Sequence, residues 1–196
     1  MPLFGNRLPK WDANTADEEL VAWVQRGERE AFGVLYDRYL PRVYAYCYRL
    51  LGQREAAEDT NTEVFMRALA ALPAYRAGSF RSWLFAIAHN VVTDEVRRSR
   101  PIVPLPDAVD LADGGPSLEE RAAVTADCLS ILLLLPQLSP DQQQVIALRL
   151  SGLSAVEIGE ALGKPHNAID GIHHRALLRL RSLVATGEAL AGKGGG

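Results

Sequence analysis

The chain has 196 residues and a formal net charge of −3 at pH 7, enough for one large domain or two small ones and no sign by itself of a nucleic-acid partner. No apolar run approaches the roughly 18 residues of a membrane span, and the first residues lack the apolar core of a signal peptide. The two cysteines, Cys47 and Cys128, are too far apart to indicate a disulfide framework or a metal cluster. We therefore expect a cytoplasmic protein with reduced thiols, no metal, no cofactor and no membrane insertion.

The small net charge hides an uneven distribution of charged residues. Two groups of arginines lie on predicted helices: Arg97, Arg98 and Arg100, and Arg175, Arg179 and Arg181. Acidic residues concentrate between these two groups. Because local fields steer a DNA ligand more than the total charge does, DNA binding is not excluded.

The first third of the chain predicts short helices after an unstructured start. Residues 1–14 show no apolar periodicity, so we expect a flexible arm. Thr15 and Glu18 form a capping-box pattern that predicts the start of the first helix. Apolar residues at helical spacing predict a second helix, and Pro41 predicts the start of a third, because proline favours the first helical turn.

Two longer helices and a linker follow. Apolar spacing predicts a helix over residues 54–72, ended by Pro73. Ser79 is placed to cap a helix that runs to Arg100 with its apolar residues, Val96 included, turned inward. Residues 101–116 are rich in Pro, Gly and Asp, which predicts an extended linker.

The last third predicts a helix-turn-helix. Capping boxes at Ser139 and Ser154 open two short helices, with Val156 among the residues expected to be buried in the second. Asn167 is placed to cap a longer helix that ends near Thr186, before a disordered tail over residues 187–196. The second helix of such a unit can lie in a DNA major groove, although a plain helical hairpin stays open. The fold class is thus all-α: two helical modules, over residues 15–100 and 117–186, joined by the linker.

Two stretches, read together, resemble the extracytoplasmic-function (ECF) family of bacterial sigma factors. The N-terminal motifs are Glu58-Asp59, Glu63-Val64-Phe65, Leu72-Pro73, Ser79-Phe80-Arg81-Ser82-Trp83-Leu84, Ile87-Ala88-His89-Asn90 and Arg97-Arg98. The C-terminal motifs are Gly152-Leu153-Ser154, Glu157-Ile158, Leu162-Gly163 and His174-Arg175-Ala176. The resemblance covers about residues 17–184 and implies sigma regions 2 and 4.

The resemblance implies a transcription initiation factor and not an enzyme. Such a protein binds core RNA polymerase, through the beta-prime coiled-coil and the beta subunit, and directs it to the −10 and −35 elements of promoter DNA. An anti-sigma factor is a further implied partner. The acidic linker is either a solvated spacer or, as the resemblance implies, a segment that threads towards the RNA path.

Residues suited to the melted −10 strand cluster around the loop after Pro73 and the helix that follows. Aromatic rings beside cations stack bases, and arginines hold phosphates. The expected residues are Tyr75, Arg76, Ser79, Arg81, His89, Asn90, Arg97, Arg98 and Arg100. Phe80 and Trp83, three apart on the helix, are expected to pack inward.

The resemblance places the polymerase contact on the helix over residues 54–72. The expected residues are Glu58, Asp59, Thr62, Glu63, Phe65 and Met66. The spacing of Glu63 and Arg67 also suits an intrahelical ion pair. Thr60 and Thr62 stand where the family prefers an apolar residue and Gln, which bears on the strength of docking.

The −35 element is assigned to the last helix. The expected residues are His166, Asn167, Asp170, Gly171, His174, Arg175 and Arg179. Asp170 stands where relatives commonly have Lys; a carboxylate is repelled by phosphates but accepts from a cytosine amino group. Gly171 costs roughly 1 kcal/mol of helix stability relative to Ala. The −35 contact is therefore either re-specified or weakened.

Two other functions remain open. One is a stand-alone helix-turn-helix regulator that binds DNA without polymerase. The other is a sigma-like interaction module whose DNA contacts have decayed. An enzyme is disfavoured because no nucleophile–base set, phosphate-binding Gly loop or carboxylate pair is present.

Overall fold

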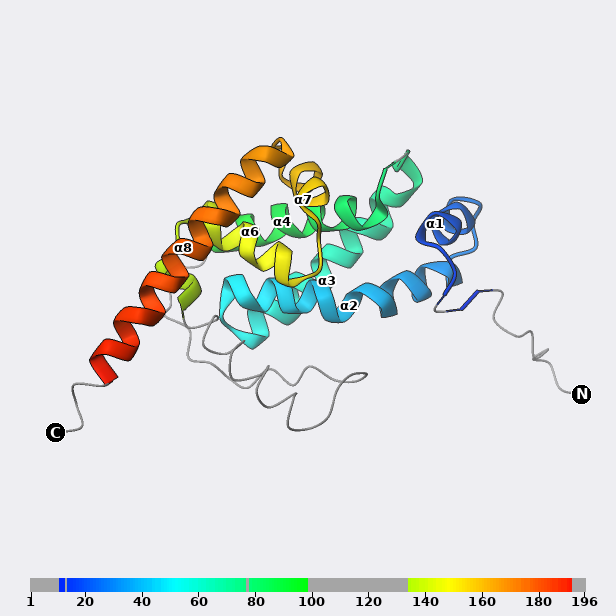
Figure 1. Cartoon of the computed structure of the whole chain (residues 1–196). Helices are drawn as coiled ribbons and strands as arrows, with labels where there is room; N and C mark the ends of the chain where they lie inside the picture. Colours follow the sequence, from blue (N-terminus) through cyan, green and yellow to red (C-terminus); the bar gives the residue numbers. More distant parts are fainter. Residues whose placement is uncertain (1–10, 13, 77, 99–133, 192–196) are drawn as a thin grey trace, which may run out of the picture.

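The computed structural model describes residues 11–12, 14–76, 78–98 and 134–191, and side chains up to Thr186. Most of the predicted arm, the linker, Arg100, Cys128, the predicted helix start at residue 117 and the last five residues lie outside the described part. Within it the elements are helices, as the all-α prediction requires, and they form two modules (Figure 1).

The N-terminal module contains four α-helices and one 3-10 turn. These are α1 (Asp17–Gln25), α2 (Glu30–Leu51), α3 (Arg54–Ala71), η1 (Leu72–Ala74) and α4 (Phe80–Arg98). Its core combines aliphatic side chains with paired aromatic rings: the buried Phe85 meets Tyr46 edge-on at 5.7 Å between ring centroids, and Tyr39 meets Phe80 at 5.6 Å. Edge-on ring pairs add to the stabilisation from burial alone.

The C-terminal module contains η2 (Leu135–Gln137), α6 (Pro140–Leu150), α7 (Ala155–Leu162) and α8 (His166–Ala191). Both predicted capping boxes are present, with Ser139 paired to Gln142 and Ser154 paired to Glu157. Gly163, in the left-handed conformation at φ 63°, ends α7 and lets the chain turn directly into α8. The helix-turn-helix is therefore confirmed.

The two modules pack against each other. Helix α6 lies against α2, and α7 lies against α4 (Figure 1). Leu153 and Ile158 of the C-terminal module are buried in the same apolar cluster as the N-terminal core. Because this cluster crosses from one module to the other, the described chain has a closed arrangement.

Several predicted helix boundaries and faces are wrong. Thr15 does not cap α1: the N-cap is Ala16, and the Thr15 hydroxyl pairs instead with Asp12. Pro41 lies inside one 22-residue helix, α2, and does not begin a new one. Leu35, Tyr39 and Val43 are all buried at four-residue spacing, so one unbroken apolar stripe runs past the proline and its packing offsets the missing backbone donor.

Three predictions for side chains and the last helix also fail. Val96 is 51% exposed in the last turn of α4, and Val156 is 57% exposed on α7. Residues two apart on a helix point about 200° apart, so Val156 cannot share a buried face with Ile158. Helix α8 begins at His166, one residue before the predicted cap Asn167, and continues to Ala191.

Candidate nucleic-acid and polymerase interfaces

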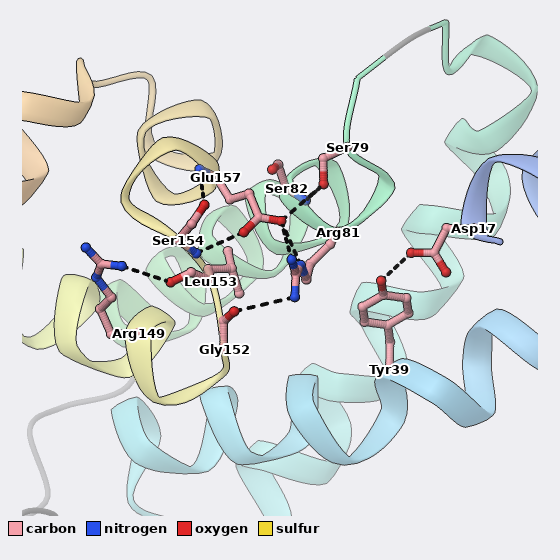
Figure 2. Close-up of polar contacts among 10 residues, drawn as sticks. All are labelled: Asp17, Tyr39, Ser79, Arg81, Ser82, Arg149, Gly152, Leu153, Ser154 and Glu157. Atoms are coloured by element: carbon pink, nitrogen blue, oxygen red, sulfur yellow. Dashed lines mark hydrogen bonds and ion pairs between the residues drawn. The ribbon is translucent and has the colours of Figure 1, made fainter. Parts of the chain in front are cut away.

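The start of α4 carries a polar cluster with a bound carboxylate. Ser79 caps the helix, since its hydroxyl accepts from the Ser82 backbone N–H at 3.2 Å. Arg81 directs its guanidinium at Glu157 of α7, with Nη2 at 2.6 Å and Nε at 2.8 Å from Oε1 (Figure 2). The same carboxylate oxygen accepts from the Ser79 hydroxyl at 3.5 Å, and Arg81 also donates to the Gly152 carbonyl at 3.4 Å. Two predicted −10 residues therefore converge on one anion.

An aromatic cluster borders this site. The Tyr75 ring lies 5.1 Å from Trp83 and 6.4 Å from Phe80. The Tyr75 hydroxyl donates to the Gly78 carbonyl across the loop, and burial raises the pKa of this hydroxyl. Phe80 is buried, as predicted, whereas Trp83 is only partly buried. Tyr75 and Trp83 thus keep part of their ring surface available to a base.

The remaining predicted −10 residues are spread along α4. Arg76 in the preceding loop is exposed, Asn90 is exposed, and His89 is half-buried. Arg97 and Arg98 are exposed in the last turn, about 25 Å from Arg81 at the helical rise of about 1.5 Å per residue. The cations of α4 therefore lie at its two ends, at a spacing that suits several phosphates of one strand and not a single pocket.

His89 lies where α4 faces the C-terminal module. Its Nδ1 atom is buried and has no hydrogen-bond partner among the described residues. Burial lowers the pKa of His89, the positive charge of Lys164 lowers it further, and Asp141 opposes the shift. Lys164 and Asp141, which pair at 2.9 Å, both belong to the C-terminal module. The structure thus places His89 at a module contact.

The predicted −35 residues share the exposed side of α8. Its buried stripe, Ile169, Ile172, Ala176 and Leu180, faces α6 and α7. His166, Asn167, Asp170, His174, Arg175 and Arg179 are all exposed, and Gly171 is partly exposed. An added Cβ at Gly171 would lie 3.4 Å from Nη1 of Arg175, so the arginine folds back across the glycine.

Asp170 has a cationic partner that the sequence did not reveal. Arg149 of α6 donates to its carboxylate at 3.4 Å, and Asp170 remains 58% exposed. The pair offsets part of the negative charge that Asp170 would bring to a DNA backbone. The Asp170 carboxylate nevertheless stays on the exposed side of α8.

The predicted polymerase residues divide between surface and core. Glu58, Asp59, Thr62 and Glu63 are exposed on α3, and Met66 is 62% exposed. Phe65 is only 5% exposed and packs between the rings of Phe32 and Tyr36. Phe65 therefore packs α3 against α2 and leaves almost no surface for a partner to contact. Thr60, at an apolar position of the family, is buried.

A groove of about 440 Å³ runs between α3 and α4 beside these residues. Its lining includes the acidic Asp59, Glu63 and Glu95 and the basic Arg67 and Arg98. The predicted Glu63–Arg67 pair is present at 2.7 Å. The groove is therefore polar and carries charges of both signs.

The sequence does not predict two of these contacts. Glu157 stands in a family motif and is placed to complete the Ser154 capping box, but neither pattern predicts its bond to Arg81, and no pattern marks Arg149. Their partners lie 76 and 21 residues away in the chain, so no local pattern signals either pair.

Within the described residues, no group of three or more His, Cys, Asp or Glu side chains suits a metal ion. None of the described helices is long and apolar enough to cross a bilayer.

Two family models match the chain: Sigma-70 region 2 over residues 35–102 and Sigma-70, region 4 over residues 134–182. The first match covers most of the N-terminal module, and the second covers the helix-turn-helix. The fold and the two matched regions thus define a sigma factor of the sigma-70 type, a class of non-catalytic transcription factors.

Similarity to individual proteins narrows this class. The ECF RNA polymerase sigma factor BldN of Streptomyces coelicolor is 35% identical over 185 residues, which cover 91% of this chain and 70% of BldN. The ECF RNA polymerase sigma factor SigW of Bacillus subtilis is 31% identical, over 81% of this chain and 91% of SigW. The chain belongs to the ECF sigma factor family, which binds core RNA polymerase and directs it to promoters.

Solved structures support the same fold. CnrH, in a complex with the cytosolic domain of CnrY, matches with a TM-score of 0.67 at 24% identity, over 89% of this chain and 99% of CnrH. The sigma factor RpoE from Bartonella quintana, in a complex with the anti-sigma factor NepR, matches with a TM-score of 0.62 at 24% identity, over 79% of this chain and 96% of RpoE.

Proposed function

We propose that this sigma factor divides promoter recognition between its two modules. Residues 15–100 dock on core RNA polymerase and hold the melted −10 strand, and residues 117–186 read the −35 duplex. The linker over residues 101–116 sets the reach between them. The observation that supports this division most is the distribution of exposed side chains: rings and arginines lie around α4, and a polar stripe lies on α8.

In the N-terminal module, we assign polymerase docking to the exposed side of α3. Glu58, Asp59, Thr62, Glu63 and Met66 combine acidic groups with one exposed apolar side chain. The adjoining groove carries charges of both signs, so it complements a partner surface of mixed charge. Tyr75 and Trp83 stack bases at the start of α4, and Arg97 and Arg98 hold phosphates at its end.

In the C-terminal module, we assign base reading to Asn167 and Asp170 and phosphate contact to Arg175 and Arg179. Asn167, Asp170 and His174 follow at intervals of three and four residues, so they form one stripe along α8. The Arg149 contact holds the Asp170 carboxylate in place, where it accepts from a cytosine amino group. The −35 element is on this basis re-specified and not simply weakened.

Run-off transcription with core polymerase on genomic fragments tests the proposal. We expect defined transcripts that depend on the full chain. Arg175→Gln should reduce initiation at all of the protein's promoters alike, whereas Asp170→Asn should change which −35 sequences are used, because base contacts specify and phosphate contacts do not. Ser182→Ala, later on the same helix, is the matched control.

Other outcomes of this assay would favour the alternatives. Tight duplex binding without polymerase, and no polymerase-dependent transcript, would indicate a stand-alone regulator. Polymerase binding with no transcript on any fragment would indicate an interaction module.

We further propose a cytoplasmic location, where core polymerase acts, and an anti-sigma factor as a regulatory partner. Two fold relatives support the second point, since CnrH was solved with CnrY and RpoE with an anti-sigma factor. Affinity capture of the full chain from native cells should recover such a partner together with core polymerase. Capture of polymerase alone, under conditions where the sigma factor is inactive, would count against the partner.

A further inference from the structure

Two residues at the contact between α4 and α7 are the same residues that the proposed function assigns to the −10 DNA strand. Arg81 and Ser79 belong to the predicted −10 surface, yet both are bonded to the Glu157 carboxylate. The Glu157 side chain is 14% exposed and that of Arg81 is 32% exposed, so solvent only partly screens the pair. A carboxylate held by an arginine and a hydroxyl is the same type of contact that these groups make with a phosphate oxygen.

Glu157 holds this position firmly. One oxygen accepts from the Ser154 backbone at 2.9 Å, which completes the capping box of α7, while the other faces Arg81. Burial opposes ionisation, but hydrogen bonds from Ser154 and Arg81 outweigh it and keep the pKa of Glu157 below its ordinary value. The carboxylate is therefore ionised at neutral pH and oriented by its own helix towards α4 (Figure 2).

The closed arrangement does not allow both promoter elements to be bound at once. Elements centred about 25 base pairs apart are separated by roughly 85 Å of duplex, at about 3.4 Å per base pair. Helix α7 precedes the recognition helix by one turn and lies directly on α4. The modules must separate for promoter binding, and separation breaks the Arg81–Glu157 contact.

Other contacts between the modules act in the same direction. Arg49 of α2 donates to the Ser151 hydroxyl at 3.2 Å, and Leu153 is buried against the N-terminal core. These contacts close the two modules together but involve none of the predicted DNA-binding residues. Among the described residues, the C-terminal module bonds two predicted strand-binding groups: Arg81 donates to Glu157 and to the Gly152 carbonyl, and Ser79 donates to Glu157.

We propose that Ser79 and Arg81 form one anion site with two alternative ligands. In the closed form the ligand is the Glu157 carboxylate, and in the open form it is a backbone phosphate of single-stranded DNA. Module packing and strand binding therefore exclude each other, and the helix-turn-helix module itself restrains the −10 surface. This inference rests on the proposed function for the identity of the second ligand.

Glu157→Gln in the full chain is the sharpest test. Glutamine also completes a capping box, so α7 should keep its start, while the negative charge that competes for Arg81 is removed. Glu160→Gln, an exposed carboxylate on the same helix, is the matched control. Small-angle X-ray scattering measures closure, and fluorescence anisotropy measures binding of a fluorescein-labelled 12-nucleotide oligothymidylate.

We expect Glu157→Gln to increase the radius of gyration and to bind the oligonucleotide about five- to tenfold more tightly, in the range typical of coupled sites. Glu160→Gln should change neither value. Arg81→Gln should weaken binding and lower the salt dependence by about 0.7 in log–log slope, as for one lost phosphate contact. With Arg81→Gln present, Glu157→Gln should give no gain in affinity.

Three results would overturn the inference: a Glu157→Gln protein that stays compact, one that opens without binding the strand more tightly, or a gain in affinity that persists with Arg81→Gln. Circular dichroism of each variant checks that the helices are intact. The run-off assay separates the two proposals. If the single and double variants of Glu157 and Arg81 bind the oligonucleotide as expected but no promoter-directed transcript forms, the proposed function is refuted. If transcripts are normal but the variants do not bind as expected, only the shared anion site is refuted.

Discussion

The two modules differ in what fills their interiors. Every Trp, Tyr and Phe of the chain precedes residue 86, so the N-terminal core combines aromatic rings with aliphatic side chains, whereas the C-terminal core contains no ring. Among the described residues, a separate cluster of the C-terminal module consists of Leu135, Leu138, Ile146, Ala176 and Leu180, with Leu134 packed against it. Its other buried residues, Ile158 among them, belong to the cluster that it shares with the N-terminal module.

This difference predicts which module is stable by itself and which depends on contact with the other. Rings bury large areas and pair in defined geometry, which gives the N-terminal module a self-sufficient core. The C-terminal module gains part of its burial only in the closed arrangement. It is therefore the module expected to lose stability when the two separate, and to regain contacts on DNA.

The largest expected effect comes from the aromatic core. Phe85→Ala removes a fully buried ring that packs edge-on against Tyr46. We expect a loss of about 3–5 kcal/mol in the free energy of unfolding, measured by urea unfolding followed by tryptophan fluorescence. All three tryptophans lie in the N-terminal part, so this signal reports that module alone. Met66→Ala, at an exposed site, is the control; equal losses in both variants would contradict an aromatic core that dominates stability.

The second effect tests the tight turn of the aliphatic module. An added Cβ at Gly159 would lie 2.6 Å from the Lys164 backbone carbonyl, which cannot move without disturbing the turn between α7 and α8. Gly159→Ala should therefore cost about 1–3 kcal/mol and weaken −35 binding. Circular dichroism should detect this loss at lower urea concentration than tryptophan fluorescence does. Coincident shifts of both signals would instead mean that the modules unfold as one unit.

How far the sequence predicts these features depends on the range of the interaction. The capping boxes at Ser139 and Ser154 are local and are confirmed. Pro41 misled the prediction because a local helix signal was overridden by an apolar stripe that packs along the whole of α2. The Arg81–Glu157 and Arg149–Asp170 pairs join distant segments, so only the tertiary packing reveals them.

The third expected effect is a gain in stability, in contrast to the two losses above. Gly171→Ala on α8 should stabilise the C-terminal module by up to about 1 kcal/mol, because alanine is the better helix former. An added Cβ would meet only Nη1 of Arg175 at 3.4 Å, the far end of a flexible side chain. Thermal unfolding followed by circular dichroism measures the gain. A destabilised variant would show that the Arg175 side chain has no alternative position, and that the glycine is required by packing.

The smallest effect concerns pH at the boundary between the modules. The pKa of His89 is lowered by burial and then by Lys164, so the folded protein favours the neutral imidazole. A lowered pKa contributes stability above the unfolded value of about 6.5, and that contribution is lost as the pH falls from there through the folded value. The closed arrangement should therefore weaken on mild acidification.

His89→Gln should remove part of this pH dependence when urea unfolding is compared at pH 7.5 and pH 5.5. His173, whose pKa is lowered by burial and by Arg149, lies on α8 within the C-terminal module. His173→Gln is thus a control that removes a similar titration away from α4. If scattering shows that acid opens the wild type and the His173→Gln variant but not the His89→Gln variant, the pH dependence belongs to the module contact. Equal opening of all three proteins would place it elsewhere in the chain.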